Sequence, residues 1–312
     1  PAISNITVDS DAAQAIRGNG TFEFERLFIR NGSTSGVTVE QSIQAEEVLG
    51  ADGDITLDSG VTLTVNGDKL SSPVNGSNAN FSPPGDVTGG TISFDGGATQ
   101  GFNAPGAAVS AVTVTGNSTV EVDGIDNSGD KTTIDGNLTI NDGSSFDLDE
   151  SRNDNLQANG NVIIDGTLAL SSSADDKGGL EVGGDLTLGS TGTFDSGTEK
   201  RVIMNGSAKQ TITSSGTLTF HDLEIANGSG LKNNPDNESA VEIASGTTVE
   251  VEEDLILTEG EFGTGGVLTL RSRFDDPNND GTGVVRDAAI TLDKDGSGTL
   301  GNGTLFSGTE TV

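Results

Sequence analysis

The residues best suited to chemistry lie near the C-terminus, where side-chain oxygens recur at regular spacing. Segment 276–281 (DPNNDG) followed by Asp287 places oxygens at loop positions 1, 3, 5 and 12, with glycine at position 6. This is the spacing of a calcium loop, in which Thr282 could add its carbonyl to the hard oxygens that the ion requires. Ca²⁺ is therefore the one cofactor suggested, with the ligands Asp276, Asn278, Asp280 and Asp287. The competing interpretation is an Asx-rich turn in a solvated acidic loop.

Adjacent acidic residues suggest a different chemistry, because enzymes that cleave polysaccharides use two carboxylates at a fixed separation. The pairs are Asp175–Asp176, Glu252–Glu253 and Asp275–Asp276. Neighbouring residues on a strand point to opposite faces, however, and a chain with 48 acidic residues contains such pairs by chance. His221 is the only histidine, which argues against triads and His-based zinc sites. We therefore predict that the chain is not an enzyme.

The elements that must position these residues repeat along the chain. A first copy, Phe24, Leu27, Ile29, Asn31 and Gly32, recurs 196 positions later as Phe220, Leu223, Ile225, Asn227 and Gly228. A degenerate middle copy, 111 positions before the last one, consists of Val109, Val112, Val114 and Gly116. Such self-similarity is typical of an elongated array. We predict one domain over residues 1–312, with internal repeats near 24–70, 94–150 and 204–272.

Short strands follow Gly-Asn or Gly-Asp pairs, at 53–57, 136–140, 160–164 and 184–188, the last three 24 residues apart. Glycine and asparagine are expected to supply the positive φ of a sharp corner, and the alternation of aliphatic residues with threonine fits a strand with one buried face. A period of about 20 to 24 residues predicts an all-β parallel β-solenoid of about 14 coils. The alternative is a row of tandem β-sandwiches. Only residues 10–17 suggest a short helical turn.

Charge limits the partners of this chain. Its 48 acidic and 15 basic residues give a net charge of −33, which disfavours nucleic acid as a partner. No apolar run is long enough for a membrane-spanning helix, so membrane insertion is not expected. Residue 1 is Pro and no basic segment followed by an apolar stretch precedes it, so a targeting peptide could already have been removed. This is compatible with secretion.

The chain also resembles a known group of proteins. The residues that carry the resemblance are Gly206, Ala208, Gln210 and Ile212, followed by the copy from Phe220 to Gly228. They are similar to the β-strand-rich repeats of secreted surface proteins from Bacteroidota and related bacteria, although Val109 replaces phenylalanine in the middle copy. The resemblance implies a scaffold rather than an activity, located outside the cell or on its surface.

The two ends of the chain suggest a function. Both are strand-like, at residues 3–8 and 304–312, and open strand edges pair with neighbours unless they are blocked. Head-to-tail contacts that do not close produce filaments. We therefore predict a structural subunit of an extracellular filament or surface layer, whose partners are copies of itself joined by terminal strands. The alternatives are a cell-surface adhesin or carbohydrate-binding module that contacts glycans, and a β-helix polysaccharide-degrading enzyme.

Overall fold

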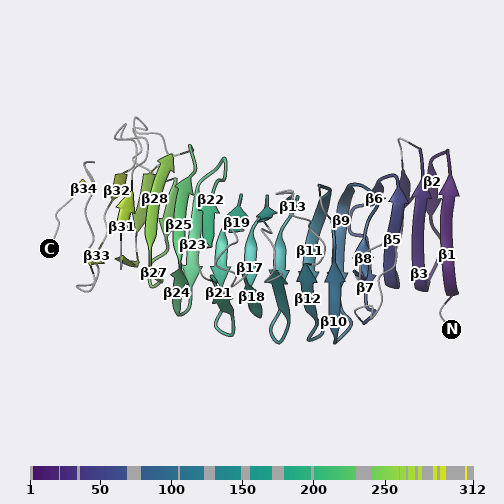
Figure 1. The fold of residues 1–312 in the computed structure, drawn as a ribbon, viewed down its shortest axis with the longest axis horizontal. Helices are drawn as coiled ribbons and strands as arrows, with labels where there is room; N and C mark the ends of the chain where they lie inside the picture. The colour runs from purple at the N-terminus through teal and green to yellow at the C-terminus, as the bar shows by residue number, and fades with distance from the viewer. Residues whose placement is uncertain are drawn as a thin grey trace.

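The structure is a computed structural model with strands stacked along one long axis, from β1 (Ile3–Ser10) at one end to β34 (Phe306–Ser307) at the other (Figure 1). It describes residues 3–20, 22–33, 36–68, 79–104, 106–122, 131–148, 155–170, 179–197, 200–229, 240–259, 261–264, 266–270, 273–275, 284–286, 289–292 and 306–307. Every regular element in these ranges is a strand, and every strand pairing is parallel. The predicted parallel β-solenoid is thus confirmed. Tandem β-sandwiches are wrong, because they require antiparallel pairing.

Each coil has three sides, and equivalent sides of successive coils pair to form three long faces. The X face contains β2 (Gln14–Ile16), β4 (Val37–Val39), β6 (Ile55–Leu57), the starts of β9 (Val87–Phe94) and β11 (Ala108–Val114), β13 (Lys131–Ile134), β16 (Asn155–Ala158), β19 (Gly179–Val182), β22 (Arg201–Met204), β25 (Asp222–Ala226), β28 (Asp254–Glu259) and β31 (Arg273–Asp275).

The Y face follows the X face along the chain. It contains the starts of β1, β3 (Phe22–Asn31) and β5 (Ile43–Asp52), then β7 (Thr62–Val65), the ends of β9 and β11, β14 (Leu138–Ile140), β17 (Val162–Ile164), β20 (Leu186–Leu188), β23 (Gln210–Ser214), β26 (Val241–Ile243), β29 (Glu261–Thr264), β32 (Val284–Arg286) and β34.

The Z face completes the coil. It contains the ends of β1, β3 and β5, then β8 (Phe81–Ser82), β10 (Thr99–Phe102), β12 (Thr119–Val122), β15 (Ser145–Leu148), β18 (Thr167–Ala169) and β21 (Thr193–Asp195). Beside β21 a separate ladder continues with β24 (Thr217–Phe220), β27 (Thr248–Val251), β30 (Val267–Leu270) and β33 (Ala289–Leu292).

Two details of the prediction need correction. The described stack has fewer coils than about 14, because equivalent positions lie up to 33 residues apart where extra chain enters a corner, as between Val48 and Phe81. In the regular middle of the stack the separation is 24 residues, as between Asn137 and Asn161. The short helical turn expected over 10–17 is also wrong. That region forms β2, which pairs with β4 over three residues.

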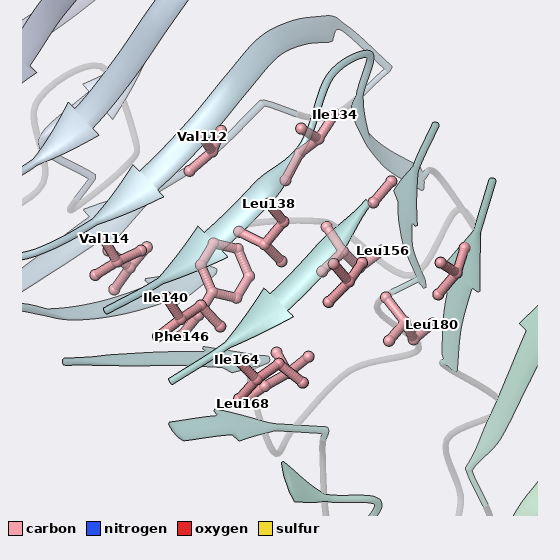
Figure 2. Packing of buried hydrophobic residues seen from close by; sticks show 14 of the residues in the cluster. Val112, Val114, Ile134, Leu138, Ile140, Phe146, Leu156, Ile164, Leu168 and Leu180 are labelled. Atoms are coloured by element: carbon pink, nitrogen blue, oxygen red, sulfur yellow. The ribbon is translucent and has the colours of Figure 1, made fainter. Parts of the chain in front are cut away.

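The core lies between the three faces. Inward side chains alternate with outward ones along each strand, and the inward aliphatic and phenylalanine side chains form one continuous cluster from Phe24 to Leu270. Figure 2 shows part of this cluster, where side chains from neighbouring coils pack against one another. In the middle of the stack the ring of Phe102 lies 5.7 Å from the rings of both Phe81 and Phe94 and 6.1 Å from that of Phe146. These separations suit edge-on and tilted ring packing, so the phenylalanines join successive coils.

Asparagine and aspartate side chains connect the coils at the corner between the X and Y faces. The Oδ1 atom of Asn137 accepts a hydrogen bond from the backbone N–H of Asn161 at 2.8 Å, and Oδ1 of Asn161 accepts one from Asp185 at 2.8 Å. In the next coil, Oδ1 of Asp185 accepts a hydrogen bond from the backbone N–H of Thr211 at 2.7 Å. Each side chain thus satisfies a backbone donor that the corner would otherwise leave unpaired.

The glycines before these side chains serve close packing rather than positive φ. Of the four predicted corners, only Gly53 has a left-handed φ, at 96°. A Cβ atom on Gly160 would lie 2.4 Å from Oδ1 of Asn137, and one on Gly184 would lie 2.3 Å from Oδ1 of Asn161. The expectation of positive φ was therefore wrong at the repeated corners. Glycine is needed there because the side chain of the previous coil occupies the space.

The repeated asparagine is a buried clamp. Asn31 and Asn227 both have no exposed surface. Nδ2 of Asn227 donates to the carbonyl of Ala208 and to Oε1 of Gln210, both at 2.8 Å, and Oδ1 accepts from the N–H of Ser229 at 2.9 Å. Asn31 makes the same set of bonds with the residues 196 positions earlier, Ala12, Gln14 and Ser33. The sequence repeat therefore reflects a repeated hydrogen-bond network.

The three copies of the sequence repeat occupy different faces of the solenoid. Phe24 lies on the Y face and Leu27 on the Z face, whereas Phe220 lies on the Z face and Leu223 on the X face. The middle copy begins with Val109 on the X face and continues onto the Y face. The repeated unit is thus one side of a coil with its corner, and not a whole coil.

The corner packing makes a first prediction. Gly160→Ala should lower the free energy of unfolding by about 1–3 kcal/mol, because the new methyl group collides with Asn137 and with the backbone of Gly136. Gly216→Ala is the matched control, since a Cβ atom there meets nothing within 4 Å. Urea titration followed by circular dichroism measures both. Equal stability of the two variants would contradict this account of the corner.

The clamp makes a second prediction. Asn227→Ala should lower the free energy of unfolding by about 1–3 kcal/mol, because it removes the hydrogen bonds of this side chain to Oε1 of the buried Gln210 and to the N–H of Ser229. Asn19→Ala changes an exposed asparagine and should stay within about 0.5 kcal/mol of the unsubstituted protein. Thermal melting of both variants tests this, and an unchanged melting temperature for Asn227→Ala would show that the clamp contributes nothing.

Candidate functional site

The predicted calcium ligands Asp276, Asn278, Asp280 and Asp287 all lie outside the described residues. Calcium binding at these residues therefore stays a prediction. In the part of the chain that the structure describes, no group of three or more His, Asp or Glu side chains is arranged to hold a metal ion.

The structure describes only some of the residues considered for enzyme chemistry, among them Glu253 and His221, whose backbones are joined by a hydrogen bond from the N–H of Glu253 to the carbonyl of His221 at 2.9 Å. Glu252 and Glu253 are both exposed, and the pair Asp175–Asp176 lies outside the described ranges. Asp275 ends β31, and its neighbour Asp276 is not described. His221 is half-buried, and its Nδ1 atom lies 3.5 Å from Oδ1 of Asp222, which accepts the backbone N–H of Asp254 at 2.9 Å. That aspartate is therefore already engaged in joining two coils.

A carboxylate pair that was not predicted from the sequence lies on the Z face. Glu121 and Asp147 are in register on β12 and β15, so their side chains project side by side from adjacent coils. Partial burial raises the pKa of Asp147, and the charge of Glu121 raises it further. These residues are far apart in the sequence, so only the strand register reveals the pair. Its chemical consequence is electrostatic repulsion across the ladder.

The first coil, β1 with β2, is the candidate functional site because no described strand pairs with its outer edge. Within the described residues β1 pairs only with β3, on one of its two edges. Ile6 and Val8 lie in register with Leu27 and Ile29, which are 1% and 0% exposed. Ile6, Val8 and Ile16 themselves are only partly buried against the core. The apolar core therefore continues up to this end of the stack.

The outward side chains of β1 are polar and locally balanced. Asn5, Thr7 and Asp9 are exposed, and Asp9 accepts a hydrogen bond from Arg30, which lowers the pKa of Asp9. Arg30 is also in register with Asp52, so charges alternate along this ladder. The outer surface at this end thus continues the pattern of the faces behind it.

The edge of β1 lacks several devices that keep strand edges apart. Proteins commonly block such edges with proline, with inward-pointing charge, or by making the strand very short. β1 has eight residues, ISNITVDS, without proline, and its inward side chains at Ile6 and Val8 are apolar. Sequence reasoning located this strand at 3–8, but it did not identify Ile16 of β2 as part of the same partly exposed end. The arrangement can accept a further parallel strand.

Comparisons with known proteins give no relative from which to transfer a function. No protein-family model, no curated protein and no solved structure matches this chain. Among the described residues no helix has the length and apolar character needed to cross a membrane.

The carboxylate pair makes a prediction about pH. The pKa of Asp147 is raised in the folded state, so the fold binds this proton more tightly than the unfolded chain does and loses stability as the pH rises through that pKa. Asp147→Asn should therefore stabilise the protein at pH 7, by less than about 1 kcal/mol because water screens the half-buried group. The gain should vanish below the ordinary pKa of aspartate.

The control for this prediction is Asp58→Asn, which changes an exposed carboxylate on a turn and the net charge by the same amount. Melting temperatures of both variants between pH 3 and pH 7 provide the measurement. A gain for Asp58→Asn as large as that for Asp147→Asn would attribute the effect to net charge and not to the pair.

Proposed function

We propose that this chain is a structural subunit of an extracellular filament or surface layer, and that copies join head to tail by stacking a terminal coil on β1. The observation that supports this proposal is the open edge of β1 together with the partly buried Ile6 and Val8 beside it. Its role is mechanical rather than catalytic, and its partners are further copies of the same chain.

The joint follows the geometry of the stack itself. A strand that adds to β1 in parallel brings its inward side chains over Ile6 and Val8, as these lie over Leu27 and Ile29. Backbone hydrogen bonds supply affinity in such strand addition, and the alternating side chains set the register. Because the added strand comes from the opposite end of another copy, the contact leaves an open edge for the next one and does not close.

A pair of substitutions on one strand tests the joint. Val8→Lys should raise the protein concentration needed for assembly at least tenfold, because it places a charge where the arriving coil has to pack. Thr7→Lys is the matched control, since Thr7 points outward on the same strand and is already exposed. Both variants should keep the β-rich circular dichroism spectrum, because Val8 has access to solvent at the end of the stack.

Negative-stain electron microscopy and sedimentation velocity provide the readout. The expected result is filaments for the unsubstituted protein and for Thr7→Lys, and single rods for Val8→Lys. Persistence of filaments in Val8→Lys would contradict the joint at β1. Single rods of the unsubstituted protein at every concentration would contradict self-assembly, and particles of fixed double length would indicate a closed pair in place of a filament.

A further inference from the structure

Charge is distributed unevenly between the end that carries the joint and the rest of the chain. Residues 1–40 contain five acidic and three basic residues, whereas the remaining 272 contain 43 acidic and 12 basic ones. The end that carries β1 is thus nearly balanced, while most of the net charge of −33 lies along the rest of the chain. An approaching copy therefore meets most of the negative charge along the body of the rod, and only a few charges at the joint itself.

The basic residues near the joint are already engaged within the chain. Arg30 binds Asp9, Nε of Arg26 lies 2.6 Å from Oε2 of Glu47, and Nη1 of Arg17 lies 3.9 Å from Oε1 of Glu40. These are all three basic residues of segment 1–40. A second copy therefore meets apolar side chains and backbone groups at this end, with little net attraction between charges to offset the long-range repulsion.

We infer that ionic strength controls the head-to-tail joint, an inference that rests on the proposed function. In about 0.01 M salt the screening length is about 30 Å, so a large part of each negatively charged rod acts on the next. In about 0.1 M salt it falls to about 10 Å, which limits repulsion to the few coils nearest the joint. The apolar contact and the strand hydrogen bonds depend much less on salt. Copies separate at low ionic strength and join at high ionic strength.

Light scattering and sedimentation velocity on the full chain test this, with NaCl from 10 mM to 500 mM and a chelator present throughout. The concentration needed for assembly should fall at least tenfold across the series. Asp11→Asn removes an exposed charge from the first coil and should lower the salt concentration at half-assembly. Asp58→Asn removes one from a turn farther along the stack and should shift that salt concentration less.

The outcomes separate the two proposals. Assembly that is equally strong at 10 mM and 500 mM NaCl would overturn salt control while leaving the filament proposal intact. No assembly of the unsubstituted protein at any salt concentration would overturn the filament proposal itself. Assembly induced by CaCl₂ in a parallel series without chelator, at an ionic strength where NaCl has no effect, would show that a bound cation, and not screening, operates the joint. Val8→Lys provides the reference for a blocked joint in every condition.

Discussion

Successive coils lie in register, and this constraint governs which residue each position can hold. In the described ladders, each strand side chain stands beside its equivalents in the neighbouring coils, about 4.8 Å away. Hydroxyl side chains tolerate such neighbours, as in the Y-face ladder of Thr64, Ser93, Thr113 and Thr139. Charges tolerate them when the sign alternates, as at Asp9 and Arg30. Where two acids meet, at Glu121 and Asp147, partial burial raises the pKa of Asp147 and the charge of Glu121 raises it further.

The same constraint explains why the repeats in this chain do not coincide with whole coils. Each of the three faces needs an apolar strand followed by a corner whose backbone groups are hydrogen-bonded. A segment that provides both can therefore form a side of the coil on more than one face. The clamp at Asn31 closes the corner after the Z face, and the clamp at Asn227 closes the corner after the X face. The connection after Asn31 reaches Gly36, five residues on, whereas the one after Asn227 reaches Ala240, thirteen residues on. A clamp therefore fixes the base of a corner whatever the length of the chain it encloses.

Much of the fold could be predicted from local pattern, because a parallel stack repeats its pattern along the sequence. Alternation of Leu, Ile or Val with Thr identified the strands, and the spacing of 24 residues identified the coil. The features that could not be predicted depend on contacts between residues that are distant in the sequence. Gly160 and Gly184 read as turn residues, yet they are glycine because Asn137 and Asn161 of the preceding coils occupy the space for a Cβ. The sequence showed Asn227 only as a repeated residue. Its role as a clamp could not be predicted, since its partner Gln210 lies 17 residues away. The carboxylate pair and the partly exposed Ile16 likewise needed the strand register.

A parallel stack has no intrinsic length, because each coil offers the next one the same edge that it received. In the proposed assembly, growth is therefore limited by what happens at the ends and by accumulated charge, and not by the core. At the first coil, Ile6 and Val8 extend the core to an edge without proline or inward charge, so local chemistry there favours addition. The net charge of −33 acts in the opposite sense and over a longer range. Short-range apolar contact and long-range repulsion respond differently to salt, so the balance between them can be shifted without any change in the fold.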